Sequence, residues 1–220
     1  MGTNIVDVFD LYAKQYDKWF ETIEGKALFK TEVEAVRLII KDLRKPFLEV
    51  GAGTGRFAKE LGIEFGIDPS SEALEIAKQR GIKVRKAKGE DLPFKDETFG
   101  AVFILFTLCF VDNPLMVLAE AKRALKKDGG LIVGIINRES RPWGQLYIRK
   151  KAESHPIYRH ASFFGINEVA EMIGKTGMAI EKYSSALCPL PSEKPYKEGV
   201  RNGLIEGSGF VCILARKLKC

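Results

Sequence analysis

The stretch Leu48-Glu49-Val50-Gly51-Ala52-Gly53-Thr54-Gly55-Arg56-Phe57 decides the fold of this chain. It reads as a short buried strand, a glycine turn and the start of a helix. Glycine suits such a turn because it tolerates positive φ and lets the backbone approach a ligand closely. The next predicted strand ends at Asp68, whose carboxylate can accept hydrogen bonds from two ribose hydroxyls. The glycine turn and Asp68 together predict a site for a nucleotide-like cofactor.

Two classes of cofactor fit a glycine turn followed by an acidic residue. Nicotinamide dehydrogenases combine the same features, with the glycine spacing GxGxxG. Here the position of the third glycine is occupied by Arg56, so the spacing is GxGxG. Arg56 is expected to crowd the close helix–strand contact and the approach of a pyrophosphate. A nicotinamide-dependent oxidoreductase is therefore the less favoured enzyme class.

Outward from this turn, predicted helices and strands alternate. Apolar periodicity and turn residues predict helices over residues 6–20, 26–41, 56–61, 71–79, 115–125 and 167–175. They predict strands over residues 46–50, 63–67, 82–85, 101–106, 131–136, 179–184 and 209–215, with a turn at 128–130. Repeated strand–helix units predict an α/β fold with a largely parallel sheet and right-handed crossovers, the last strand being antiparallel.

Length and composition fit one soluble domain. The 220 residues carry a formal net charge of +6, but the basic residues are spread among 29 carboxylates, so no nucleic-acid partner is predicted. No apolar run reaches the length of a membrane span and no secretory signal is recognised, which predicts a cytoplasmic protein without membrane contact. We expect a single domain over 1–220, with a helical cap at 1–42 and a substrate lid at 137–164. The four cysteines form no metal-binding cluster, so no metal is expected.

Four sequence blocks, in order, resemble the class I S-adenosylmethionine-dependent methyltransferases. The resemblance covers residues 9–133 and points to the small-molecule branch that includes the quinone-ring methyltransferases. The blocks are the stretch quoted above, Gly66-Ile67-Asp68-Pro69-Ser70, Glu90-Asp91-Leu92-Pro93-Phe94, and Ala124-Leu125-Lys126-Lys127-Asp128-Gly129-Gly130. The resemblance implies a Rossmann-like seven-stranded methyltransferase sheet with one antiparallel strand and helices on both faces.

The resemblance also implies a cofactor and the residues that bind it. The cofactor is S-adenosylmethionine, its product is S-adenosylhomocysteine, and the acceptor is a small molecule. The expected cofactor-binding residues are Tyr16, Glu49, Gly51, Ala52, Gly53, Asp68, Pro69, Gly89, Glu90, Asp91, Phe106 and Thr107. Lys88 departs from the family, which commonly carries at this position an Asp that accepts from the adenine amino group. For Glu49, orientation of the turn is favoured over contact with the methionine amino group.

The chemistry needs no dedicated base, because methyl transfer from a sulfonium depends mainly on alignment and exclusion of water. If a base is used, the only histidines are His155 and His160, and His160 is a weak candidate. A surface or hydrogen-bonding role is the stronger interpretation of both. The expected acceptor pocket is lined by Tyr12, Tyr16, Phe106, Tyr147, His160 and Phe163. The oligomeric state is left as monomer or homodimer, and a non-catalytic S-adenosylmethionine- or nucleotide-binding module remains the alternative.

Overall fold

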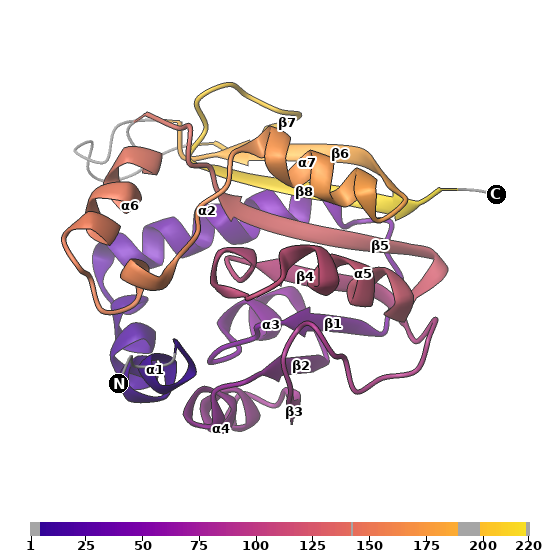
Figure 1. Ribbon diagram of the computed structural model, residues 1–220, viewed down its shortest axis with the longest axis horizontal. Coiled ribbons are helices and arrows are strands. Elements are labelled where there is room, and N and C mark those ends of the chain that lie inside the picture. Colours follow the sequence, from indigo (N-terminus) through magenta and orange to yellow (C-terminus); the bar gives the residue numbers. More distant parts are fainter. Residues whose placement is uncertain (1–4, 142, 189–198, 219–220) are drawn as a thin grey trace.

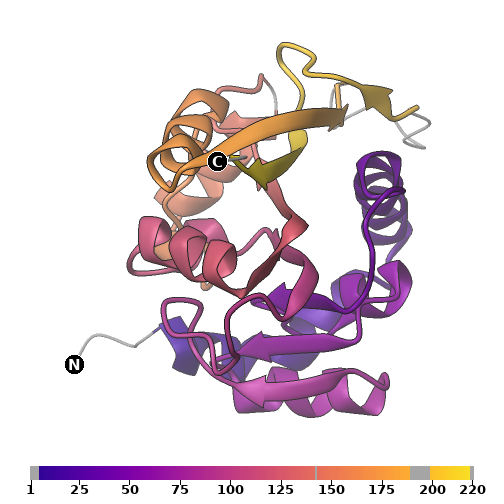
Figure 2. The same ribbon diagram turned by 90° about the vertical axis from the view of Figure 1, so that its right-hand side faces the viewer.

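One twisted sheet runs through the computed structural model, which describes residues 5–141, 143–188 and 199–218. Its strands lie in the order β3-β2-β1-β4-β5-β8-β6-β7 (Figures 1 and 2). Their bounds are β1 Phe47–Val50, β2 Phe65–Asp68, β3 Lys83–Lys86, β4 Phe99–Leu105, β5 Leu125–Ile136, β6 Met178–Ala186, β7 Arg201–Asn202 and β8 Phe210–Lys217.

The sheet is parallel from β3 to β5 and antiparallel beyond. Leu48 of β1 pairs with Phe65 of β2 and with Val102 of β4, all in parallel register. The strand β8 then pairs antiparallel with both β5 and β6, and β7 pairs antiparallel with β6. Because β1, β2 and β4 are parallel neighbours, their carboxyl ends meet at one edge of the sheet, where ligands of open α/β sheets bind.

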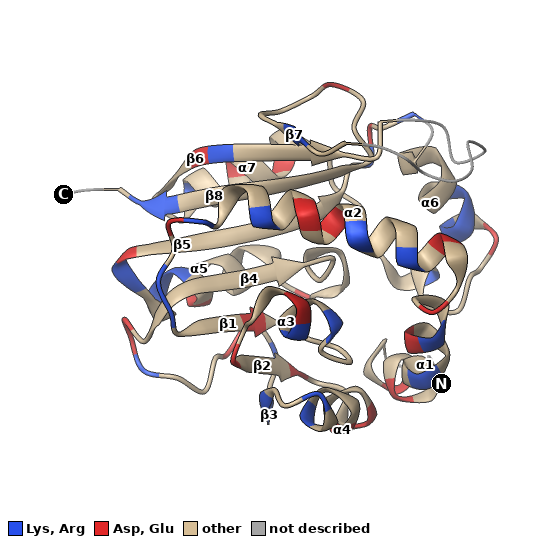
Figure 3. Cartoon of the chain, turned by 180° about the vertical axis from the view of Figure 1, so that it is seen from behind, with Lys and Arg blue, Asp and Glu red and all other residues tan. Residues whose placement is uncertain are grey.

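Helices cover both faces of the sheet. The bounds are α1 Ile5–Trp19, α2 Ile23–Ile39, α3 Arg56–Leu61, α4 Ser71–Gln79, α5 Pro114–Ala124, α6 Trp143–Ala152 and α7 Ile166–Lys175. One buried cluster packs α5 and α7 against the sheet, and a second packs α2, α3 and α4 against its other face. Figure 3 shows α2 and α3 in front of the sheet, with charged residues on the outward side of α2. Among the helices of the described chain, none is long and apolar enough to cross a membrane.

Local sequence explains several element boundaries. The hydroxyl of Ser70 accepts from the N–H of Ala73 and caps α4, and the Asn113 side chain accepts from the N–H of Met116 and caps α5. Strand β4 is buried along its whole length, as expected for a central strand covered on both faces. Strand β3 lies at the edge of the sheet and exposes Lys83, Arg85 and Lys86.

The structure corrects three details of the predicted fold. The sheet has eight strands rather than seven, because the two residues of β7 pair with β6. The turn expected at 128–130 falls inside β5, where Leu125 pairs with Phe99 and Gly130 with Ala101, so the residues between them bulge out of the ladder. The stretch 137–164, for which no helix was predicted, contains α6. The prolines at 189, 191 and 195 lie outside the described residues.

Helix α1 is fixed against the sheet edge by ionic hydrogen bonds to Asp17. The Asp17 carboxylate accepts from Thr54 Oγ1 at 2.7 Å, from Arg56 Nε at 2.7 Å and from Arg80 Nη2 at 2.8 Å. Arg56 also lies over the ring of Phe20, 5.2 Å from its centroid. Nearer the helix start, Asp10 accepts from the hydroxyl of Ser70 at 2.6 Å. Arg56, the residue that replaces the third glycine, thus connects α3 to α1.

Asp17→Asn should loosen α1. Burial raises the pKa of Asp17, but the hydrogen bonds from Arg56, Arg80 and Thr54 outweigh it and hold this pKa well below its ordinary value. A depressed pKa stabilises the fold above the unfolded-state value of about 3.9, and that contribution disappears as the pH falls further. At pH 7 we expect the substitution to lower the free energy of unfolding by about 2–4 kcal/mol, measured by urea titration.

The matched control is Asp7→Asn on the same helix, because Asp7 is exposed. Equal unfolding midpoints for the two variants would contradict the role given to Asp17.

Candidate functional site

A pocket opens beyond the carboxyl ends of β1, β2 and β4, with α1 as its cover. It encloses about 1040 Å³ of space free of protein atoms, including the part open to solvent. The sheet side contributes the glycine turn, Asp68 and the residues after β4, and α1 contributes apolar side chains. The pocket is lined by Ile5, Val6, Phe9, Ala13, Tyr16, Val50, Gly51, Gly53, Thr54, Asp68, Pro69, Ala73, Ala87, Lys88, Gly89, Glu90, Leu105, Phe106, Thr107, Phe110, Val111 and Asp112.

The glycines of the turn have different surroundings. Gly51, Gly53 and Gly55 all have positive φ, at 74°, 51° and 75°. A Cβ atom at Gly51 would lie 2.3 Å from the Thr107 side chain, and one at Gly55 would lie 2.9 Å from the Cβ of Ala77. A Cβ atom at Gly53 would meet nothing within 4 Å, although Gly53 lines the pocket. The space that a side chain would occupy at Gly53 is therefore open to a ligand.

The carboxylate of Asp68 connects the turn to the end of β2. Its Oδ2 accepts from the N–H of Gly53 at 2.9 Å, and its Oδ1 accepts from the N–H of Ser70 at 2.8 Å. Burial raises the pKa of Asp68 to about 6, although these two N–H groups act in the opposite direction. Each carboxylate oxygen has a second lone pair, so Asp68 can still accept hydrogen bonds from a ligand in the pocket.

Glu49 lies behind the turn rather than in the pocket lining. Its side chain is buried, and among the described residues its Oε2 atom has no hydrogen-bond partner. Burial raises the pKa of Glu49 well above its usual value, whereas the nearby backbone N–H of Ala58 lowers it. Ala58 belongs to the first turn of α3, whose N-cap residue, Gly55, has no side chain to offer. The arrangement therefore supports orientation of the turn and of α3 by Glu49.

Charged residues line one side of the pocket, beginning with the segment that follows β3. Lys88 forms an ion pair with Asp112 at 3.0 Å, and both residues line the pocket. The Glu90 carboxylate accepts from the N–H groups of Asp112 and Asn113, each at 3.1 Å. The ammonium group of Lys88, which departs from the family pattern, is therefore paired with the carboxylate of Asp112.

Most of the expected cofactor residues come together in this one pocket. Those that line it are Tyr16, Gly51, Gly53, Asp68, Pro69, Gly89, Glu90, Phe106 and Thr107. Ala52 and Glu49 are buried next to the turn without lining the pocket, and Asp91 is exposed to solvent. Sequence reasoning missed Ile5, Val6, Phe9 and Ala13 of α1. Their helical spacing could have identified the covering face, since Phe9, Ala13 and Tyr16 lie on one side of a helix.

Phe106 has the left-handed conformation, with φ 57°, directly after β4. This conformation is uncommon for a residue with a side chain and costs roughly 1–2 kcal/mol. The Phe106 ring stacks on Phe210, with 5.0 Å between ring centroids, and packs near Phe57 at 5.5 Å. Phe106 also lines a second, smaller cavity together with Cys109 and Phe163. Phe106 therefore lies between the main pocket and this smaller cavity.

The two histidines lie outside the main pocket lining. The His155 Nδ1 atom accepts from the backbone N–H of Ile157 at 3.3 Å, and its ring lies 4.7 Å from that of Tyr158. His160 Nε2 accepts from Arg159 Nε at 2.9 Å. This hydrogen bond places His160 against its own neighbour in the chain rather than against the pocket, which favours the hydrogen-bonding interpretation.

Comparison with known proteins identifies relatives over the whole chain. Residues 48–133 match a family model described as a methyltransferase domain. A solved structure from Thermotoga maritima, described as a SAM-dependent methyltransferase and possible histamine N-methyltransferase, is 37% identical, with a TM-score of 0.88 over 98% of this chain and 100% of that one. An uncharacterised protein of Methanocaldococcus jannaschii is 45% identical over 97% of this chain and its own full length. A demethylmenaquinone methyltransferase of Tropheryma whipplei is 37% identical over 46% of this chain and 47% of its own.

Gly53→Ala should weaken ligand binding in the pocket without a comparable loss of stability. The added methyl group would enter space that the protein leaves open, so we expect the affinity for S-adenosylhomocysteine to fall at least about tenfold, or about 1.4 kcal/mol. Isothermal titration calorimetry measures this loss directly.

The matched control is Gly81→Ala. Gly81 also has positive φ and open space at its missing Cβ, but it is exposed after α4, away from the pocket. Both variants carry a similar strain of about 1 kcal/mol. A similar loss of affinity in both would show that strain, and not occupied ligand space, explains the effect.

Proposed function

Because this chain belongs to the S-adenosylmethionine-dependent methyltransferases, we propose that it methylates a small-molecule acceptor. The chain is an enzyme of that class, its cofactor is S-adenosylmethionine and its product is S-adenosylhomocysteine. It resembles the quinone-ring methyltransferases in sequence. The observation that supports a small acceptor is the pocket itself, because α1 covers it with apolar side chains.

The residues of the pocket fit the expected cofactor. The open space at Gly53 admits the methionine portion, Asp68 accepts from the ribose hydroxyls, and Pro69 with the segment 87–90 borders the adenine. Bound S-adenosylmethionine supplies a methyl group on a positively charged sulfur. The protein aligns the acceptor with that methyl group and excludes water from it, which is the main requirement of the reaction. Tyr16 and Phe106 border the pocket where an acceptor would enter.

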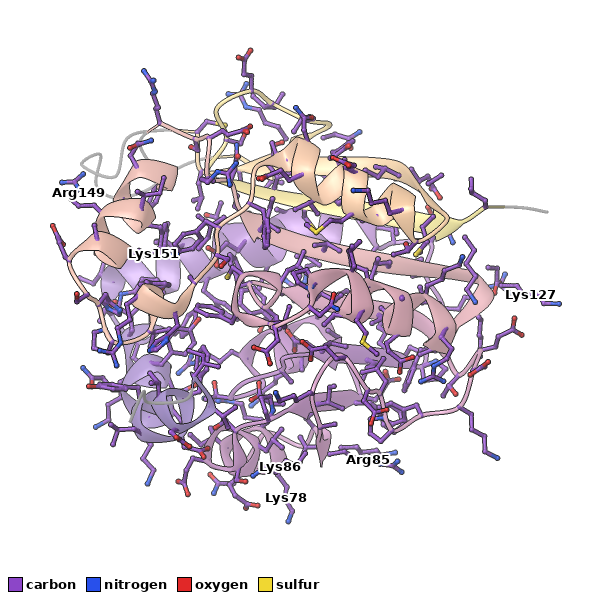
Figure 4. The ribbon with its side chains drawn as sticks, viewed as in Figure 1. Lys78, Arg85, Lys86, Lys127, Arg149 and Lys151 are labelled. Atoms are coloured by element: carbon purple, nitrogen blue, oxygen red, sulfur yellow. The ribbon has the colours of Figure 1, made fainter. Side chains whose placement is uncertain are left out.

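The proposal includes a cytoplasmic location and no nucleic-acid or membrane partner. Figure 4 shows the labelled basic residues in separate regions: Lys78, Arg85 and Lys86 near β3, Lys127 at one end of β5, and Arg149 and Lys151 on α6. These labelled residues do not form one continuous basic stripe of the kind that supports binding to phosphate backbones. We propose a monomer or homodimer that forms one domain, with 1–42 as cap and 137–164 as lid.

The first experiment is a calorimetric titration of the purified protein with S-adenosylmethionine, S-adenosylhomocysteine and NAD. Selective binding of the first two supports the assignment of the pocket, and a screen of small acceptors for S-adenosylhomocysteine formation follows. Binding of NAD alone would refute the assignment.

The affinity for S-adenosylhomocysteine should depend on pH through Asp68. The ribose hydroxyls donate to the ionised carboxylate, so binding favours the deprotonated form. Because burial raises the pKa of Asp68 in the free protein to about 6, affinity should be level above that pH and fall up to about tenfold per pH unit below it. Titrations between pH 5 and pH 8 at about half-unit steps measure this dependence.

Asp68→Asn is the control for this pH dependence. It should lower the affinity at pH 8 by about 1.5–3 kcal/mol, the scale of a hydrogen bond to a charged group, and remove the change near pH 6. Equal pH profiles for the variant and the unaltered protein would rule out Asp68 as the ribose ligand.

A further inference from the structure

The order of the strands fixes the direction in which the cofactor extends across the pocket. Strands β3 and β1 lie on opposite sides of β2, so Ala87, which follows β3, and Gly53, which follows β1, flank Asp68 from opposite sides. The N–H of Ala87 donates to the Asp68 carbonyl at 3.3 Å, and the N–H of Gly53 donates to the Asp68 carboxylate at 2.9 Å. With the methionine portion at Gly53 and the ribose at Asp68, the adenine lies on the side of Ala87.

This end of the pocket combines apolar side chains with an ion pair. We call it the adenine end, and its lining consists of Pro69, Ala87, Lys88, Val111 and Asp112. The Nζ atom of Lys88 lies 3.0 Å from Oδ2 of Asp112, and both side chains are more than half exposed, so the pair forms the rim. The amino group of adenine donates hydrogen bonds. An adenine ring between the apolar side chains therefore needs an acceptor at this rim.

The carboxylate of Asp112 is held in place from two directions. Oε1 of Glu90 accepts from the backbone N–H groups of Asp112 and Asn113, each at 3.1 Å, and the Asn113 side chain caps α5. The Lys88 ammonium group donates to Oδ2 of Asp112. Within the described part of the chain, Oδ1 of Asp112 has no hydrogen-bond partner. This oxygen is therefore available to a donor in the pocket.

The other residues of the segment after β3 are poorer acceptors for an amino group. Lys88 carries only N–H donors, and Gly89 has no side chain. Oε1 of Glu90 already accepts from two backbone N–H groups. Asp91 is exposed and does not line the pocket. The carboxylate best placed to accept from the amino group is therefore that of Asp112, which comes from the segment after β4.

We propose that Asp112 accepts a hydrogen bond from the amino group of adenine, and that Lys88 is the positioning residue that holds Asp112 for it. This inference rests on the proposed function and specifies how its cofactor is recognised. An exposed ion pair contributes little to stability, but at the rim of a ligand pocket it presents a fixed acceptor. A base with a carbonyl oxygen in place of the amino group would bring two acceptors together, which disfavours its binding.

The test compares two ligands that differ only at this position of the base. They are S-adenosylhomocysteine and S-inosylhomocysteine, in which a carbonyl oxygen replaces the amino group. Calorimetric titration of the full chain gives both affinities without turnover. We expect the unaltered protein to bind S-adenosylhomocysteine at least about tenfold more tightly, the scale of one hydrogen bond to a charged group.

Substitutions of the ion pair should change this preference in a graded way. Asp112→Ala should lower the affinity for S-adenosylhomocysteine about tenfold and leave that for S-inosylhomocysteine unchanged or higher, because only the first ligand loses a hydrogen bond. Lys88→Met should reduce the preference about two- to threefold, since Asp112 keeps its oxygens but loses its partner. Lys88→Arg, which keeps the ion pair, should retain the preference.

The matched control is Asp96→Ala. The Asp96 side chain is 73% exposed, against 78% for Asp112, and it forms an ion pair with Arg123 at 2.7 Å outside the pocket lining. The control should therefore leave both affinities unchanged.

The two ligands separate recognition of the base from support of the loop. Equal affinities in the unaltered protein would overturn the inference. A parallel loss of both affinities in Asp112→Ala would also overturn it, because Asp112 would then only maintain the shape of the loop. An unchanged preference in Lys88→Met would overturn the positioning role of Lys88. Binding of neither ligand to the unaltered protein would instead refute the proposed function.

Discussion

The two hydrogen bonds accepted by Asp68 determine the geometry of the site. They hold the N–H of Gly53, beyond β1, and the N–H of Ser70, before α4, on a single carboxylate at the end of β2. The glycine turn therefore has a fixed position before any ligand binds, which lowers the entropy that binding must overcome. Helix α1 is placed from the same region, because Asp10 accepts from the hydroxyl of Ser70. The glycine turn on the sheet side of the pocket and helix α1 on its other side are therefore both positioned by residues at the end of β2, namely Asp68 and Ser70.

The repeating part of the fold could be predicted from sequence because its signals are local. Helices α3 and α4 begin and end at the predicted residues, where a glycine turn and a Ser70 cap mark the boundaries. The helix α6 could not be predicted in this way, since its sequence mixes aromatic and basic residues without a clear apolar face. Its stability comes from packing, for example of buried Trp143, rather than from propensity. The pair β6–β7 depends on residues far apart in sequence.

The residues of the candidate site likewise include some that local sequence predicted and others that it did not. The motif residues around Gly51 and Asp68 are close in sequence to the strands that place them, and they meet as expected. The burial of Glu32 on α2 was not predicted, because a glutamate in an amphipathic helix is usually solvated. Its register with Leu28 and Ile39, which places it on the buried face, was the available signal. The role of Arg56 in holding Asp17 of α1 could not be read from spacing, since the two residues meet only after folding.

The basic residues of the edge strand β3 affect how molecules of this protein associate with one another in solution. A free edge offers unpaired backbone groups to any other strand, including that of an identical molecule. Here Lys83, Arg85 and Lys86 are exposed along β3, so two such edges that approach one another bring like charges together. Continuation of the sheet from molecule to molecule is thereby disfavoured, most strongly at low ionic strength where screening is weakest.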